Sequence, residues 1–103
     1  MNARTAQQPT RRALALLFVL QGHTMEGLRL KQIADAIRTT PSTALRDLEV
    51  LAEEGIAERI PGRDEYWRLS PRLIQLARAH ELEMARHRQR LEETEQRYTR
   101  NPN

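Results

Sequence analysis

The sequence predicts a mainly α fold in which three helices are followed by a β-hairpin and one long helix. Apolar residues recur at helical spacing in three stretches before residue 55. Between residues 56 and 69 the pattern changes to the alternation that short strands show. Residues 72–97 contain neither glycine nor proline and are rich in Leu, Ala, Glu, Arg and Gln, which favours a single long helix.

The first helix is expected to begin at residue 9. Pro9 suits the first turn of a helix, and Thr10 can cap it. The apolar run ALALLFVL, residues 13–20, covers most of the helix surface, so we expect this helix to be the buried one. Gly22 ends it. Residues 1–8 are polar and lack periodicity, and we expect a flexible arm there.

A linker leads to a short extended piece around Leu28 and Leu30, and a second helix is expected over residues 31–37. The apolar face of this short helix is formed by Ile33, Ala34 and Ile37. Residues 38–40 are then left as a short turn before the next helical pattern begins.

The third helix is expected over residues 41–54. Pro41 is compatible with its first turn, Thr40 can cap it, and Gly55 ends it. Its apolar stripe is formed by Ala44, Leu48, Val50 and Leu51.

Two short strands are expected next, over residues 56–60 and 66–69, joined by turn-forming residues at 61–64. We expect Trp67 to lie in the core beneath this hairpin. Ser70 and Pro71 then provide the cap and the first position of the long helix.

This order of elements is that of a winged helix-turn-helix, in which the second helix of the pair enters the major groove of DNA. We therefore expect such a domain over residues 9–70, with double-stranded DNA as its partner. Arg46 can donate two hydrogen bonds to a guanine, and the free backbone N–H groups at the helix start can receive a phosphate. The residues expected to contact DNA are Arg11, Arg12, Thr40, Pro41, Ser42, Thr43, Arg46, Arg59, Arg63 and Arg68.

The long helix, expected over residues 71–100, carries a heptad frame in alternating steps of four and three residues. We expect it to pair two subunits, because two reading helices related by a two-fold axis bind a palindromic site. The alternative is a helix that packs on the domain by residues 73–77 and then projects into solvent. The residues expected in the dimer seam are Leu73, Ala77, His80, Met84, His87, Leu91 and Tyr98.

Residues 11–77, approximately, resemble the N-terminal domain of IclR-type transcriptional regulators. The similarity rests on the stretches RALALLFVL, LRLKQIADAI, STALRDLEVLAEEGIAER and EYWRLSPRLIQLA. It implies a winged helix-turn-helix domain that binds DNA, with the family's Ser-Thr pair and following Arg falling on Ser42, Thr43 and Arg46.

The chain departs from this family in two respects. Pro41 stands where a basic or polar residue is expected, and Asp47 and Glu49 add negative charge to the third helix. Those acids repel phosphate unless they face away from DNA or accept from cytosine. The family also has a large C-terminal ligand-sensing domain, and we expect no such effector domain in these 103 residues.

The net charge is modest, at +3, and residues 31–70 are acidic, with six basic and eight acidic side chains. A DNA-binding protein of this charge must gather its basic groups on one face. Two alternatives therefore stay open. One is a winged-helix module for protein–protein contacts, and the other is a non-specific, nucleoid-type DNA-binding protein.

The absence of cysteine excludes disulfides, thiol nucleophiles and thiolate metal sites. The sequence has no Gly-rich phosphate loop, nucleophile elbow or H-E-x-x-H motif, so we expect no enzyme, no cofactor and no metal site. Nothing resembles a signal peptide, and the longest apolar run, residues 13–20, is too short to span a bilayer. We expect a cytoplasmic, nucleoid-associated protein.

Overall fold

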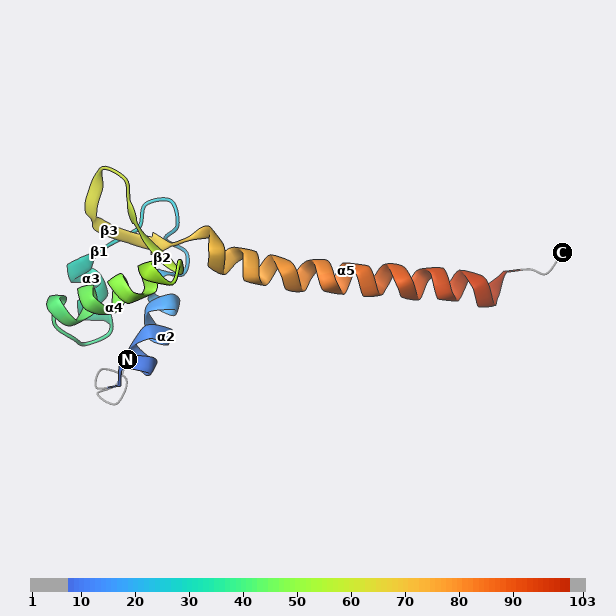
Figure 1. The fold of residues 1–103 in the computed structure, drawn as a ribbon, viewed down its shortest axis with the longest axis horizontal. Helices are drawn as coiled ribbons and strands as arrows, with labels where there is room; N and C mark the ends of the chain where they lie inside the picture. Colours follow the sequence, from blue (N-terminus) through green and yellow to red (C-terminus); the bar gives the residue numbers. More distant parts are fainter. Residues whose placement is uncertain (1–7, 101–103) are drawn as a thin grey trace. The chain divides into compact units, whose positions relative to one another are not determined.

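The computed structural model describes residues 8–100, and these divide into two compact units that meet between Leu73 and Ile74. The predicted flexible arm lies outside the described residues except for Gln8. The elements, shown in Figure 1, are α2 (Pro9–Leu20), β1 (Leu28–Arg29), α3 (Leu30–Ala36), α4 (Pro41–Glu53), β2 (Ala57–Ile60), β3 (Arg63–Leu69) and α5 (Pro71–Thr99). The mainly α fold with a small sheet and a long last helix is confirmed.

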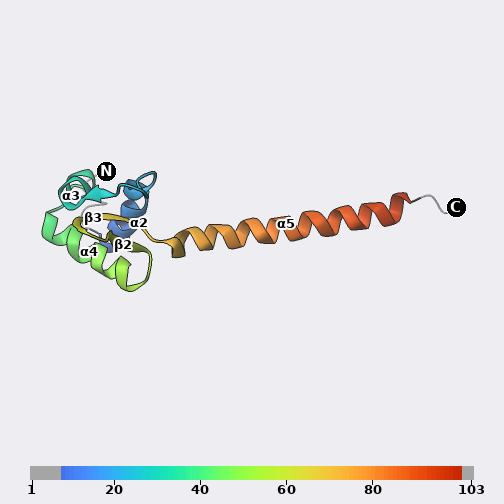
Figure 2. The same cartoon turned by 90° about the horizontal axis from the view of Figure 1, so that it is seen from above.

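The first unit has a single core between its three helices and its sheet. Helices α3 and α4 both lie below β3 in Figure 1, and seen from above they extend to either side of it (Figure 2). All the elements before α5 except β1 bury side chains in this core, and Leu73 at the start of α5 packs against it. The core cluster consists of Ala15, Leu16, Leu20, Ile33, Ile37, Leu48, Ala57, Trp67 and Leu69.

Helix α2, expected to be the buried helix, is buried on one face only. Leu16 and Leu20 are fully buried, whereas Leu14 is 55% and Phe18 70% exposed. Residues 14 and 18 are one turn apart and share a face, and within this unit the core covers only the opposite face of the helix. The predicted cap is wrong, since the N-cap residue is Gln8 and Thr10 lies within the helix.

Helix α4 follows the prediction at both ends. Thr40 caps it, because its hydroxyl oxygen accepts a hydrogen bond from the backbone N–H of Thr43 at 3.2 Å. Gly55 follows the helix with a φ of +76°, the left-handed conformation typical of a helix stop. Val50, however, is 54% exposed, because it lies about 200° round the helix from buried Leu48 and so faces solvent.

The sheet is antiparallel with the order β1-β3-β2. The central strand β3 begins at Arg63, three residues earlier than expected, and Trp67 within it is 1% exposed, which confirms its predicted place in the core. Gly27 leads into β1 with a φ of +71°, and a Cβ there would lie 2.8 Å from the carbonyl oxygen of Trp67. Only glycine fits this close approach between the loop and β3.

The start of α5 is tied to the end of α4. Ser70, expected to cap α5, donates its hydroxyl to the carbonyl of Gly55 and its backbone N–H to the carbonyl of Ile56. From there α5 runs without interruption to Thr99, and it buries no residue completely. None of the helices between residues 8 and 100 has the length and apolar character needed to cross a bilayer.

Candidate nucleic-acid interface

The N-terminal half of α4 presents short polar side chains and one arginine. Ser42 and Arg46 are exposed and lie one turn apart on the same face of the helix. Thr43 is half-buried beside them, and its hydroxyl accepts a hydrogen bond from that of Thr40 at 3.1 Å. The first turn contains no acidic residue, and the backbone N–H groups at such a helix start favour an anion. This end of α4 therefore has the chemistry that a phosphate and a base edge require.

Asp47, which follows Arg46 in the sequence, is paired with an arginine of α2. Its carboxylate accepts hydrogen bonds from Nε and Nη2 of Arg12 at 2.6 and 3.3 Å, and the two side chains are only 15% and 12% exposed. The hydrogen bond to Asp47 raises the pKa of the Arg12 guanidinium. Arg12, predicted to contact DNA, thus holds α4 against α2 and neutralises the acid that would otherwise repel phosphate.

We expect Arg12→Met to lower the free energy of unfolding by about 2 kcal/mol, because it leaves the charge of Asp47 largely desolvated and unpaired. Urea denaturation followed by circular dichroism measures this. Lys31→Met is the matched control, since the ion pair of Lys31 with Asp35 is 3.7 Å long and exposed and contributes little. Equal stability of the Arg12 variant and the control would contradict the assigned contact.

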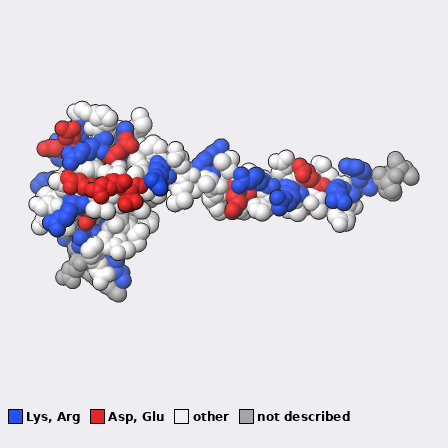
Figure 3. Space-filling view, viewed as in Figure 1, with Lys and Arg blue, Asp and Glu red and all other residues white. Residues whose placement is uncertain are grey.

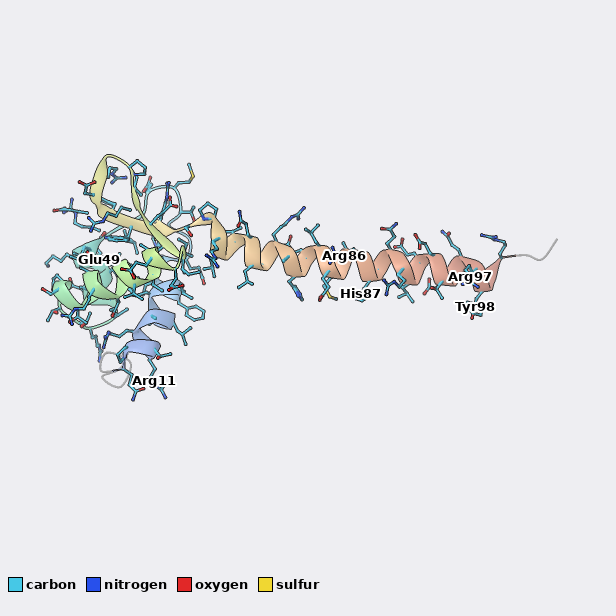
Figure 4. All side chains as sticks on the ribbon, viewed as in Figure 1. Arg11, Glu49, Arg86, His87, Arg97 and Tyr98 are labelled. Carbon is cyan, nitrogen blue, oxygen red and sulfur yellow. The ribbon has the colours of Figure 1, made fainter. Side chains whose placement is uncertain are left out.

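The C-terminal half of α4 borders an acidic groove. Glu49, labelled in Figure 4, and Glu53 line it together with Glu58 of β2, and Trp67 forms part of its wall. Figure 3 shows acidic side chains in a row across this face of the domain, with basic side chains on either side. The polarity of the exposed α4 surface therefore changes along the helix, from neutral and basic at its start to acidic at its end.

The three arginines predicted on the wing fall into two groups. Arg59 lies over the Trp67 ring at 4.7 Å, and one of its guanidinium nitrogens is 3.6 Å from the Glu49 carboxylate. Arg68 pairs with Glu58, its cross-strand neighbour, at 2.9 Å. Both therefore neutralise acids beside the groove. Arg63 lies elsewhere, at the start of β3, and is exposed.

A family model, the IclR helix-turn-helix domain, matches residues 9–61, just over half of the chain. The chain belongs to the IclR helix-turn-helix family. The matched segment runs from the first residue of α2 to the turn after β2, so it includes both α3 and α4. It supports a DNA-binding regulator with a non-enzymatic role. No curated protein and no solved structure matches the chain.

Two further arginines of this IclR-type domain are exposed, one on α2 and one between α3 and α4. Arg11, in the first turn of α2, is exposed and extends away from the domain (Figure 4). Arg38, which the sequence did not single out, lies in the turn between α3 and α4 and is exposed. Its φ is +57°, a left-handed conformation in which glycine is the usual residue after a helix. An arginine in that position points to a role other than stability.

We expect Arg38→Gly to raise the free energy of unfolding by about 0.5 kcal/mol, because glycine adopts a positive φ without strain. The same variant is expected to bind DNA several-fold more weakly, with a salt slope smaller by about 1, if Arg38 contacts a phosphate. Thermal unfolding and anisotropy titrations measure the two effects. Arg38→Lys, which keeps the charge, serves as the control. A more stable variant with unchanged affinity would remove Arg38 from the interface.

Two other residues were not predicted as part of the site, Arg29 of β1 and Tyr66 of β3. The register places them opposite each other, and Arg29 donates a hydrogen bond to the Tyr66 hydroxyl at 3.1 Å. They are 37 residues apart in the chain, and their spacing does not show that they meet. Only the register of a three-stranded sheet brings them together.

The residues predicted in the dimer seam lie along α5. His87 and Tyr98 project from the same side of the helix in Figure 4. Met84, Leu91 and Tyr98 are 43%, 58% and 81% exposed, whereas Leu73 packs against the core of its own unit. Within residues 8–100, no three His, Asp or Glu side chains lie close enough together to hold a metal ion.

Proposed function

We propose that this protein is a sequence-specific transcriptional regulator that binds palindromic DNA as a homodimer and acts on the nucleoid in the cytoplasm. The observation that carries the proposal is the exposed N-terminal half of α4, where Ser42 and Arg46 share one face and Asp47 is neutralised by Arg12. Helices of this kind read bases in the major groove with their first turns.

Each residue of the proposed interface has its own task. Arg46 reaches a guanine edge, Ser42 and Thr43 contact a base or a phosphate, and the backbone at Pro41 receives a phosphate. Thr40 fixes the start of the helix through its cap. The backbone contacts at the rim are assigned to Arg11, Arg38 and Arg63, whose side chains are exposed.

Selection of binding sites from random duplexes tests this function. The purified protein is incubated with a pool of random-sequence DNA at moderate salt, and the bound fraction is sequenced. A regulator enriches an inverted repeat whose half-sites lie about ten base pairs apart or a multiple of that. Retention without enrichment identifies a non-specific DNA-binding protein instead.

The homodimer is proposed on the exposed apolar side chains of α5 and their heptad spacing. In a parallel pair, Glu83 and Arg90 of one helix occupy g positions and meet the partner's Arg88 and the partner's Glu95 at e positions. Both contacts join opposite charges. A parallel pair also keeps both reading domains at the same end of the pair, as a palindromic site requires.

A single engineered cysteine tests this pairing, because the chain has no cysteine of its own. Thr94 falls at a d position, where the same residue of both chains meets across a parallel seam. We expect Thr94→Cys to give a disulfide-linked dimer under mild oxidation. Gln89→Cys, on the outer face of α5, is the control and should stay monomeric on a non-reducing gel. Equal cross-linking of the two variants would contradict the seam.

One observation favours a second function, a protein–protein interaction module. The groove between α4 and β2 has a volume of about 570 Å³ and is lined by three glutamates together with Arg59 and Trp67. These features suit a basic peptide segment. Arg59 and Arg68 pair with two of these glutamates, Glu49 and Glu58, so a basic ligand would have to displace them. If the protein retains no DNA at low salt, this groove is the surface at which to seek a protein partner.

A further inference from the structure

Two arginines from different strands converge on one tyrosine of the central strand β3. Arg29 of β1 donates from Nη2 to the hydroxyl of Tyr66 at 3.1 Å, and its guanidinium carbon lies 5.4 Å from the ring centre. Arg63 places its guanidinium carbon 3.8 Å from the centre of the same ring. Nη1 of Arg63 also donates a hydrogen bond to the carbonyl oxygen of Glu26 at 3.1 Å, so a second contact holds this guanidinium in place. Tyr66 therefore holds both cations.

The surrounding acids neutralise this pair of arginines only weakly. Glu65 approaches Nε of Arg29 at 3.8 Å, beyond hydrogen-bond distance, and the two side chains are 76% and 54% exposed. Such a pair contributes little in water. Among the described residues, no buried carboxylate faces Arg63. Each guanidinium has five N–H donors, and the contacts above occupy few of them.

A hollow of about 380 Å³ lies beside Tyr66. It is lined by Arg29, Lys31, Gln32, Asp35 and Tyr66. Asp35 is 3.7 Å from the ammonium of Lys31, and both are well exposed. The hydrogen bonds and charges of Arg29 and Arg63 lower the pKa of the Tyr66 hydroxyl. The electrostatic environment at this point thus favours an anion.

We propose that Arg29 and Arg63 form a clamp for a phosphate of the DNA duplex that α4 reads, and that Tyr66 is the positioning residue that preorganises both guanidiniums. The proposal rests on the proposed DNA-binding function and adds a contact at the β1–β3 edge of the sheet. Each guanidinium fork can donate two hydrogen bonds to phosphate oxygens. Ordering both guanidiniums before binding reduces the entropy lost on DNA contact.

Anisotropy titrations of one labelled duplex at several salt concentrations test the clamp. Arg29→Gln is expected to bind about five- to tenfold more weakly, with a salt slope reduced by about 1. Tyr66→Leu, which removes no cation, is expected to weaken binding to a similar degree because both guanidiniums lose their support. Tyr66→Phe keeps the ring for Arg63 and should lose less. Arg78→Gln, which removes an arginine paired with Glu81 on α5, is the control for lost charge.

A second measurement follows the phenol itself. In a protein labelled with ¹³C-tyrosine, the pH titration of the Tyr66 ring carbon reports its pKa. We expect this pKa to rise in Arg29→Gln, and also to rise in the wild type when DNA is added, because the phosphate then takes hydrogen bonds and neutralises both guanidiniums. A purely structural contact between Arg29 and Tyr66 predicts the first change without the second.

The outcomes separate the clamp from the function on which it rests. If the wild type binds DNA and Arg46→Ala weakens it, but Arg29→Gln and Tyr66→Leu behave like Arg78→Gln, the clamp is wrong and the function stands. If the pKa of Tyr66 does not change when DNA is added to the wild type, the clamp is also wrong and the DNA-binding function still stands. If the wild type retains no DNA even at low salt, both proposals are overturned.

Discussion

Replacing Trp67 by Ala is expected to lower the free energy of unfolding by about 4 kcal/mol. Trp67 is the largest fully buried side chain and lies at the centre of the sheet, where β1 and β2 both pair with its strand. Its removal leaves a cavity between the sheet and the helices and takes away the surface on which Arg59 stacks. The loss is a large part of the stability of a domain of this size.

Urea denaturation measures this effect. Unfolding is followed by far-ultraviolet circular dichroism and not by tryptophan fluorescence, because the variant lacks the only tryptophan. Phe18→Ala is the matched control. It also removes an aromatic ring, but one that is 70% exposed, and should cost well under about 1 kcal/mol. Trp67→Phe should be milder than Trp67→Ala, since it keeps a ring and removes a buried indole N–H that has no hydrogen-bond partner among the described residues. Comparable losses for Trp67→Ala and Phe18→Ala would contradict the assigned core.

The second large effect is expected at Arg46. On the duplex enriched by selection, Arg46→Ala should weaken binding about 10- to 100-fold, the value of one bidentate contact with guanine. It should also relax the sequence preference at a single position of each half-site. Both follow from the place of Arg46 on the exposed face of α4, in the first half of the helix.

Arg86→Ala is the control for Arg46→Ala, because it removes the same charge from the exposed surface of α5 (Figure 4). Affinities of both variants are measured on the selected duplex and on a scrambled one. A base contact lowers only the affinity for the selected duplex. A uniform loss on both duplexes would assign Arg46 to a phosphate, and no loss at all would remove it from the interface.

Much of the fold could be predicted because its signals are local. Thr40 and Pro41 mark the start of α4 and Gly55 marks its end, and each acts through its own backbone conformation. The strand pattern predicted β2 and β3 on either side of a Pro-Gly turn, and the absence of Gly and Pro predicted α5. Ile33, Ala34 and Ile37 are buried as their spacing indicates.

What the sequence could not reveal depends on contacts between distant residues. Arg12 and Asp47 are 35 residues apart, so the sequence alone does not show that the two side chains neutralise each other. The exposed side of α2 was missed for a related reason. The apolar run does not say how many neighbours a helix has, and Phe18 is left in solvent because the core of this unit covers the opposite face.

The candidate site also has some features that local sequence signals predict and others that depend on contacts between distant residues. The exposed position of Arg46 follows from helical spacing once α4 is located, and the acidic end of α4 can be read from Glu49 and Glu53. The separation of Arg59 from Arg63 cannot be predicted from the sequence, because it depends on a shift in the β2–β3 register between Arg59 and Ile60.

The most direct test of DNA binding by this domain is the retention of mixed genomic DNA fragments by the purified protein at two salt concentrations, with Arg46→Ala alongside. We expect strong retention at about 50 mM salt, a loss of one to several orders of magnitude in affinity at about 200 mM, and stronger enrichment of specific fragments by the wild type than by Arg46→Ala. If neither the wild type nor Arg46→Ala retains DNA at the lower salt concentration, that result would contradict DNA binding altogether.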